Sequence, residues 1–294
     1  MTRRIVVPLN ETTRAERALP IAVHLARTME VPLVLLSVAY WPTSDHPGTP
    51  GYHEGLMHDY RDVDAESLVV TSGGSTASAI ASMCRPEDIV CMGVDHTNTA
   101  SELFIGSVFF ELVRNFHGPI VAVGPNATIP PGADRLLICL DGLRHSIRGL
   151  DLIEAFADPV HLTPFLVQAI EPSGPGDAAI ARHDVIDSAY LQGIASEIRD
   201  HAGNHRADIS WDVLHGDASH AIGAESHNPE VAFVGLATDA VDPVTRMISP
   251  SLANELLRTS HRPLVLLSAT ARVLRSTLIP RAIPAVTSPS TEPT

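Results

Sequence analysis

Residues 88–124 read DIVCMGVDHTNTASELFIGSVFFELVRNFHGPIVAVG, and this stretch decides the fold. Its two short apolar runs, Ile89–Val94 and Ile120–Val123, are rich in β-branched residues, which is typical of buried strands. Between them, apolar residues recur at helical spacing from Val108 to Phe116, and Gly118-Pro119 predicts the end of that helix. The order of strand, loop, helix and strand is typical of a parallel α/β sheet.

The loop between the first strand and the helix has the features of an anion site. Gly93 ends the strand and Gly106-Ser107 begins the helix, so we expect unpaired backbone N–H groups around one small volume. These donors and the positive end of the helix dipole favour an anion such as phosphate. Gly93 alone would fit the end of any such strand, and Ser107 alone would fit a helix N-cap. Only their joint spacing predicts a phosphate site.

Strands and helices alternate through the rest of the chain. Apolar runs predict strands at 4–9, 33–39, 67–71, 135–140, 160–170, 209–214, 231–236 and 263–268, and amphipathic runs predict helices at 13–26, 56–63, 75–84, 147–156, 178–201, 219–226 and 249–259. Residues 40–55 are rich in Pro, Gly and His and are predicted to form a loop. The alternation predicts an α/β fold of two tandem doubly wound domains. Each would have a five-stranded, mainly parallel sheet with helices on both faces.

A repeat in the sequence predicts the two domains. Gly93 and Gly235 are 142 positions apart, and so are Ser107 and Ser249. One offset shared by several motifs indicates a duplication. The predicted limits are 1–125 for the first domain, 126–133 for a linker, 134–270 for the second domain and 271–294 for a mobile tail rich in Pro, Ser and Thr.

Composition excludes several functional classes. The net charge of −14 argues against binding of nucleic acid or an anionic membrane, and no apolar run of about 18 residues predicts a membrane span. All twenty basic residues are arginine, which excludes Schiff-base chemistry and a lysine-dependent phosphate loop. The three cysteines, Cys84, Cys91 and Cys139, are expected to be reduced core residues of a cytoplasmic protein.

The fifteen histidines give no convincing metal site. Three groupings were considered: His53 with His58 and Asp59, His201 with His205, and His215 with His220. None includes a third ligand fixed by spacing, so we interpret them as surface residues. The sequence also lacks a G-x-S-x-G elbow and paired carboxylates beside an evident cleft. We therefore predict neither catalytic residues nor metal ligands.

With these motifs in place, the sequence resembles the universal stress protein family in its tandem form, over nearly the whole chain except the tail. Nucleotide-binding members have the motif G-x2-G-x9-G-[ST] after the fourth strand. Gly93 and Gly106-Ser107 match this motif, whereas His96 stands at its second glycine. The resemblance implies that ATP or a related adenine nucleotide is bound by Pro8, Asn10, Val38, Met92, Gly93, His96, Gly106, Ser107 and Val108, with Asp141, Gly235 and Ser249 at the corresponding positions of the second domain.

The resemblance also implies how the two domains meet. The fifth strands of the family commonly pair across a two-fold axis, which here would join residues 120–123 to residues 264–267 within one chain. The chain would then be a pseudo-dimer, with a second copy as a possible further partner.

Some residues depart from the family pattern. Asn10 replaces an aspartate and loses a charge-assisted hydrogen bond, which is about twice as strong as a neutral one. Asp95 adds negative charge, and His96 would either contact phosphate or fill the vacated site. In the second domain Thr238 and Ile248 replace glycines.

Two functions therefore stay open. The first is a cytoplasmic stress-response protein whose first domain binds an adenine nucleotide as a sensor or regulator. The second is an interaction scaffold that binds no nucleotide. A nucleotidyl-transfer enzyme is a third class, but its H-I-G-H and K-M-S-K-S motifs are absent.

Overall fold

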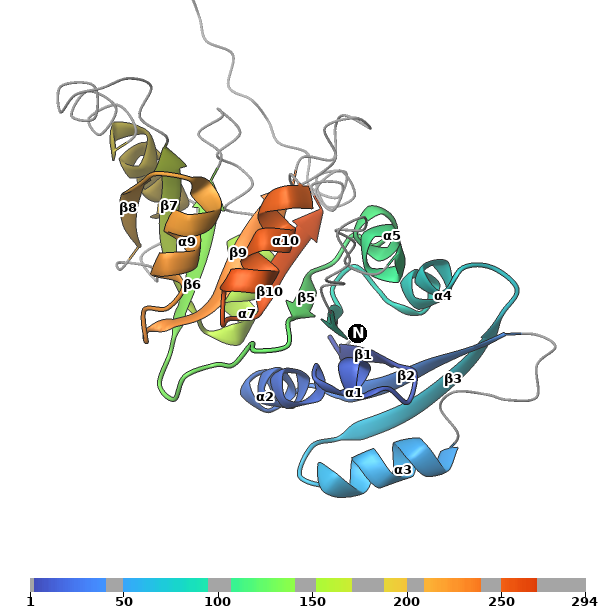
Figure 1. Ribbon diagram of the computed structural model, residues 1–294. Coiled ribbons are helices and arrows are strands. Elements are labelled where there is room, and N and C mark those ends of the chain that lie inside the picture. The colour runs from blue at the N-terminus through green and yellow to red at the C-terminus, as the bar shows by residue number, and fades with distance from the viewer. Residues whose placement is uncertain are drawn as a thin grey trace, which may run out of the picture.

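The computed structural model contains one ten-stranded sheet (Figure 1). It describes residues 3–40, 50–94, 107–140, 152–170, 188–199, 209–238 and 250–268. The strands are β1 (Ile5–Leu9), β2 (Leu33–Tyr40), β3 (Ala65–Ser72), β4 (Ile89–Gly93), β5 (Ile120–Val123), β6 (Arg135–Leu140), β7 (Thr163–Ile170), β8 (Ser210–His215), β9 (Val231–Thr238) and β10 (Leu264–Ser268). Their order is β3-β2-β1-β4-β5-β10-β9-β6-β7-β8.

Helices cover both faces of this sheet. They are α1 (Thr13–Glu16), α2 (Leu19–Met29), α3 (Pro50–Asp59), α4 (Thr76–Met83), α5 (Ser107–Asn115), a π-helical turn η1 (Ile153–Ala157), α7 (Asp158–Val160), α9 (Ala218–Glu225) and α10 (Pro250–Thr259), and residues 188–199 are also helical. Side chains of α2, α3, η1 and 188–199 share one apolar cluster with the sheet. Side chains of α4, α5, α9 and α10 share a second cluster on the opposite face.

The two halves of the sheet have the same strand order. Read from the outer edge inward, the first half is β3-β2-β1-β4-β5 and the second is β8-β7-β6-β9-β10. All neighbouring strands are parallel except β5 and β10, which pair antiparallel through Ile120–Ala122 and Leu264–Leu266. The predicted fold class and the predicted pairing of the two fifth strands are both confirmed.

The halves are also joined away from this strand pair. Both apolar clusters include residues from the two halves. A guanidinium nitrogen of Arg3 donates to the carbonyl oxygen of Ala155 at 3.2 Å, and the backbone N–H of Thr128 donates to the carbonyl of His261 at 2.8 Å. Burial of shared apolar surface is the main stabilising contribution here, because it scales with the area removed from water.

Two predicted boundaries are wrong. Residues 50–55 were predicted to be a loop, but α3 begins at Pro50, a residue that the first turn of a helix tolerates. Packing of Tyr52 and Leu56 against the core fixes this helix despite the Pro- and Gly-rich composition. The strand predicted from Val160 begins at Thr163, because Asp158-Pro159 extends the preceding helix until His161 ends it with a left-handed φ of 61°.

Candidate functional site

The candidate site lies where the strand order reverses in the first half. β1 has β2 on one side and β4 on the other, so the connections of the sheet diverge between β1 and β4. Ligands of open α/β sheets bind at the carboxyl ends of the strands at such a point. Five of the predicted residues belong to this region: Pro8, Asn10, Val38, Met92 and Gly93. The fold thus brings together positions from three separate parts of the sequence.

Three predicted residues contribute apolar surface on one face of the sheet. Val38 is buried, and Met92 and Val108 are partly buried against the same cluster, which α4 and α5 cover. Val108 follows Ser107, the first residue of α5, as the sequence predicted for the start of this helix. The described part of the structure does not include the Ser107 side chain or the predicted site residues His96, Gly106, Asp141 and Ser249.

The turn after β1 fixes the orientation of Asn10. The hydroxyl of Thr12 donates to Oδ1 of Asn10 at 2.6 Å and accepts from the backbone N–H of Ala15 at 3.3 Å, which caps α1. Glu11 between them has a left-handed φ of 57°. Because Oδ1 already accepts from Thr12, the Nδ2 amide of this exposed side chain is available to donate. Asn10 is thus set to donate hydrogen bonds, whereas an aspartate could only accept them.

Gly93 is required by the packing of α1 on the sheet. A Cβ atom at this position would lie 1.8 Å from the carbonyl oxygen of Arg14 and 3.3 Å from Cα of Ala15. Both are backbone atoms, so no side-chain rotation could relieve the overlap. A glycine that permits close helix–strand packing is known from dinucleotide-binding folds. The identity of residue 93 is therefore explained by the chain itself, and a phosphate is not needed to account for it.

The corresponding glycine of the second half is covered by a side chain. A Cβ atom on Gly235 would lie 2.4 Å from Cδ2 of Leu152 and 3.3 Å from Cδ1 of Leu136. Leu152 belongs to the helical segment that follows the first strand of this half, so Gly235 and Gly93 have the same packing role. In the second half, however, the contact is apolar and comes from flexible side-chain ends.

Sequence reasoning missed a buried histidine next to the site. His53 has no exposed surface, and its Nε2 lies 2.9 Å from Oγ of Ser37, whose hydroxyl donates to the Leu9 carbonyl at 3.1 Å. Its Nδ1 lies 2.7 Å from Oγ of Ser67. With the Ser37 proton used on Leu9, Nε2 donates to Ser37, and in the neutral ring Nδ1 then accepts from Ser67. Through Ser37, His53 connects α3 to the carboxyl end of β1.

Burial lowers the pKa of His53, and the charge of Glu11 opposes this effect. The neighbouring Tyr52 hydroxyl donates to Oε1 of Glu16 at 2.8 Å, so α3 also holds α1 in place. Burial and this bond raise the pKa of Tyr52. The spacing of Tyr52 and Leu56, one helical turn apart, was the sequence feature that could have revealed α3.

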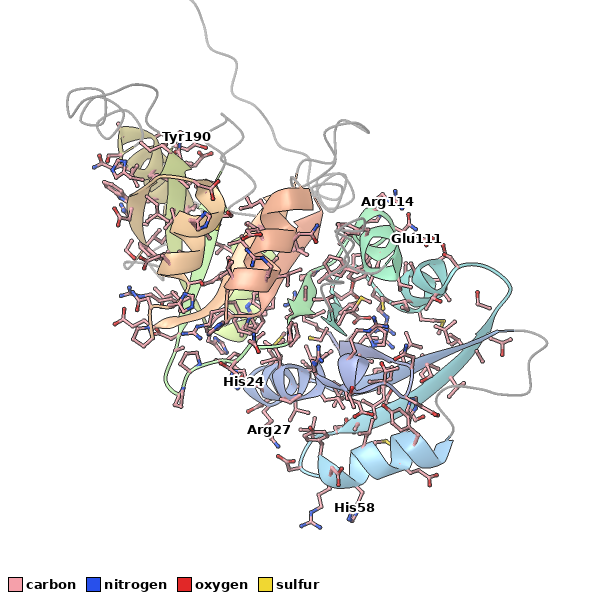
Figure 2. All side chains as sticks on the ribbon, in the orientation of Figure 1. His24, Arg27, His58, Glu111, Arg114 and Tyr190 are labelled. Carbon is pink, nitrogen blue, oxygen red and sulfur yellow. The ribbon has the colours of Figure 1, made fainter. Side chains whose placement is uncertain are left out.

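His53 and His58, the histidines of the first candidate metal grouping, point in different directions from α3. Figure 2 shows His58 on the outward side of α3, where it is exposed, whereas His53 faces the core. Both ring nitrogens of His53 are engaged by serines. Within the described residues, no three His, Cys, Asp or Glu side chains converge as metal ligands.

The comparisons with known proteins identify the first half. Residues 1–124 match the model of the Universal stress protein family. The first half of the chain is a universal stress protein domain. No curated protein matches the sequence. None of the helices within the described ranges is both long and apolar enough to cross a membrane.

Solved structures extend the likeness to both halves. A universal stress protein from Archaeoglobus fulgidus DSM 4304 is similar over 91% of this chain and 99% of its own, with a TM-score of 0.61 and 15% identity. A protein of unknown function from Pseudomonas aeruginosa PAO1 is similar over 94% of this chain and 98% of its own, with a TM-score of 0.60 and 15% identity. At these identities the likeness is one of fold.

Proposed function

We propose that the universal stress protein domain binds an adenine nucleotide at the carboxyl ends of β1 and β4 and acts as a cytoplasmic sensor or regulator. The observation that supports this proposal most is the placement of Asn10 and Gly93 at the carboxyl ends of the neighbouring strands β1 and β4, with Val108 of α5 packed against the same apolar cluster as Met92. Three sequence segments with family-like residues converge at the position where this class of sheet binds ligands.

The described residues suggest a division of roles in this site. The Nδ2 amide of Asn10 would donate to an acceptor of the base or the ribose. Val38, Met92 and Val108 would supply apolar contact for the base. The backbone N–H groups at the start of α5 would face the phosphates, where the helix dipole favours negative charge. In this proposal Pro8 shapes the end of β1, and His96 and Gly106 belong to the phosphate loop.

For the second half we propose that no nucleotide binds. Thr238 and Ile248 stand where the family motif has glycines, and a β-branched residue fits poorly at a tight phosphate turn. Asp141 and Ser249 would then have no ligand. The limits of the two domains, 1–125 and 134–270 with residues 126–133 as linker, remain part of this proposal, as does the tail at 271–294.

A specific observation favours the alternative of an interaction scaffold without nucleotide. Gly93 lies so close to the backbone of Arg14 that packing alone requires a glycine here, without any ligand. If this packing is its only role, the motif match overstates the likeness to nucleotide-binding members.

Titration calorimetry with ATP, ADP and AMP distinguishes the two functions. We expect one nucleotide per chain, and Asn10→Ala should weaken binding about tenfold, since one lost hydrogen bond costs about 1–1.5 kcal/mol. Asn115→Ala, an exposed asparagine in the last turn of α5, is the matched control and should bind normally. Absence of heat with all three nucleotides, together with no adenine nucleotide in small molecules released from purified protein, would refute nucleotide binding and leave the scaffold.

A further inference from the structure

The two outer strands of the sheet have different free edges. β3 and β8 lie at its two ends, and each pairs with one neighbour among the described strands. Figure 1 shows β3 as a long strand at the border of the first half, with α3 packed on one face. β3 has eight residues and keeps an unbroken register with β2, without a bulge. An edge of this length exposes a row of backbone donors and acceptors.

The hydrogen-bond pattern identifies which groups form this row. The backbone N–H of Leu33 donates to the carbonyl of Asp64 at 2.8 Å, and Leu33 is in register with Ala65. In a parallel ladder, alternate residues direct both backbone groups to the same side. The even-numbered residues from Glu66 to Ser72 therefore face β2. The remaining four residues direct their N–H and C=O groups outward: Ala65, Ser67, Val69 and Thr71.

The edge at β8 is blocked by its own side chain. The N–H of Gly216 donates to the carbonyl of Ile170 at 2.9 Å, so by the same alternation Val213 faces outward. That outward N–H donates instead to Oδ1 of Asp212 at 2.8 Å. A carboxylate on the edge also opposes the approach of another strand.

β3 is less protected than β8. Its one charged residue is Glu66, and it has no lysine, arginine or proline. Its outward-facing Val69 is 41% exposed, the largest value among the exposed large apolar residues of the described chain. Natural edge strands usually resist pairing through charge, proline, bulges or short length. Apart from the charge of Glu66, this edge has none of these devices, which favours its use in strand pairing.

We propose that β3 pairs antiparallel with β3 of a second copy of this chain. One register engages all four outward residues: Ala65 opposite Thr71 and Ser67 opposite Val69, each pair occurring twice. The two-fold axis then passes beside Leu68, and each of the four pairs exchanges two hydrogen bonds. A two-fold axis makes the contact closed, so assembly stops at the dimer.

The distribution of charge favours a second copy in this orientation. The amino end of β3 has two acidic residues besides Asp62, which pairs with Arg27; these are Asp64 and Glu66, whereas residues 71–74 at its carboxyl end have no charge. Antiparallel pairing places each acidic end beside an uncharged end, so like charges are not directly opposed. The chain already joins its two halves by antiparallel pairing of equivalent strands, β5 and β10. The proposed contact repeats that geometry at the opposite edge of the first half.

Sedimentation equilibrium of the full chain tests this contact. We expect a dimer of twice the 31.4 kDa chain mass. Val69→Pro removes an outward N–H that the fold itself does not use, and Val69→Lys adds charge to the edge. Each should raise the dimer dissociation constant about tenfold or more, since it acts twice in a symmetric interface. Met83→Lys is the matched control, because Met83 is 36% exposed and lies on α4, away from the β3 edge. It should dimerise normally.

Amide hydrogen exchange gives a second measurement that needs no variant. Raising the wild-type concentration should protect the outward N–H groups of Ser67, Val69 and Thr71. Three outcomes would overturn the proposal: a wild-type monomer at all concentrations, a dimer unaffected by both Val69 variants, or equal dissociation by Met83→Lys. Nucleotide binding in the first half does not enter the measurement, so the two proposals succeed or fail separately.

Discussion

The two halves of the molecule share a topology but differ in how equivalent polar residues are used. Arg4 immediately precedes β1 and Arg135 begins the equivalent strand β6, 131 positions later. Their partners, Asp88 and Glu230, are 142 positions apart. In the first half, Asp88 is fully buried and lies 2.6 Å from Arg4, which is 18% exposed. In the second half, the Arg135–Glu230 pair at 2.8 Å is 32% and 55% exposed. The same pair is therefore part of the interior in one half and of the surface in the other.

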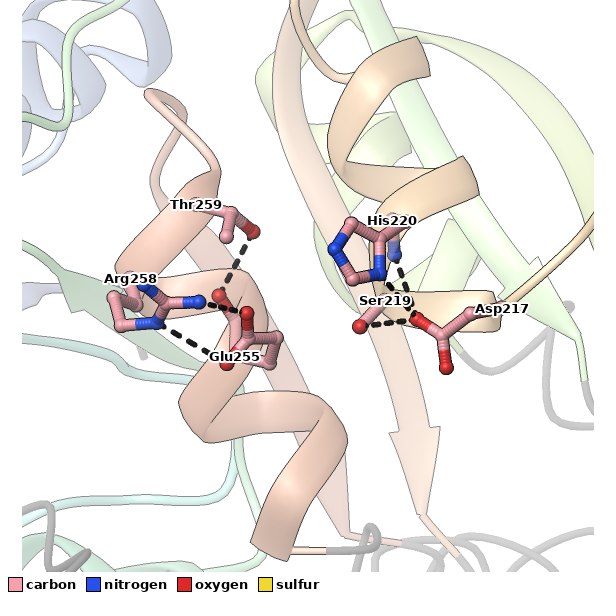
Figure 3. Close-up of polar contacts among 6 residues, drawn as sticks. All are labelled: Asp217, Ser219, His220, Glu255, Arg258 and Thr259. Atoms are coloured by element: carbon pink, nitrogen blue, oxygen red, sulfur yellow. Dashed lines mark hydrogen bonds and ion pairs between the residues drawn. The ribbon is translucent and has the colours of Figure 1, made fainter.

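The helices beside the sheet show the same divergence. In the first half, Ser75 at the start of α4 donates to Glu111 of α5, so a hydrogen bond joins two helices. In the second half, Asp217 caps α9 and accepts from Ser219 and His220, and Glu255 pairs with Arg258 on its own helix (Figure 3). These bonds remain within one helix. The two halves thus share the strand order and the apolar packing of the sheet, while their polar partners differ.

The buried ion pair gives the largest expected difference between the halves. Asp88→Asn should lower the free energy of unfolding by about 3 kcal/mol, because it leaves the partly buried Arg4 without its countercharge. The neighbouring backbone N–H groups of Arg4 and Arg85, which Asp88 accepts at 3.1 and 2.9 Å, would also lose a charged acceptor. Glu230→Gln, the matched change, should cost less than about 1 kcal/mol. Urea unfolding measures both, and equal losses would show that burial does not distinguish the pairs.

The two strand-end glycines give the next largest difference. Gly93→Ala should destabilise the protein by about 2 kcal/mol, because its Cβ meets the rigid backbone of Arg14 and α1 must shift. Gly235→Ala meets the flexible end of Leu152 and should cost about 1 kcal/mol. Thermal unfolding of both variants checks the order. The reverse order would contradict the assigned packing of α1 on β4.

The pH dependence of stability gives the smallest expected difference, and it distinguishes the halves by pH window. Burial lowers the pKa of His53 below 6.5, so the unfolded state binds this proton more tightly than the folded state. The contribution of His53 to the free energy of unfolding is therefore fully present above about pH 6.5, and it is lost as the pH falls through the folded-state pKa. His24, labelled on α2 in Figure 2, acts in the same window because burial also lowers its pKa.

Asp217 of the second half acts at lower pH. Hydrogen bonds from Ser219 and then His220 lower its pKa from 3.8 to about 2. Its stabilising effect is present above the unfolded-state value and is lost as the pH falls through the folded-state value. Urea midpoints across pH should show that His53→Gln flattens only the decline below about pH 6.5. Asp217→Asn should flatten only the loss of stability at pH values below the unfolded-state pKa of the aspartate. If either variant changed the pH range predicted for the other, the assignment would be refuted.

Much of the fold follows from local pattern. The strands from Ile89 and Ile120 and the start of α5 at Ser107 were predicted because apolar spacing and glycine positions are local properties. The prediction of a loop up to Gly55 failed because packing against the core, and not local propensity, determines α3. For the candidate site, the positions of Asn10 and Gly93 were predictable from the motif and its spacing. It could not give the proximity of Arg14 to Gly93, which depends on a contact between distant segments.

The sequence by itself determined the alternation of strands and helices, the repeated spacing of motifs and the list of family-like residues. Each of these depends on the order of residues along the chain. Only the tertiary structure decided that Asp88 is buried and Glu230 exposed, and that the ring nitrogens of His53 lie against Ser37 and Ser67. It also decided that β3 pairs on one side only among the described strands, while the outward N–H of Val213 on β8 bonds to Asp212. These properties depend on which atoms exclude water or lie within hydrogen-bond distance, and the folded packing of remote segments sets both.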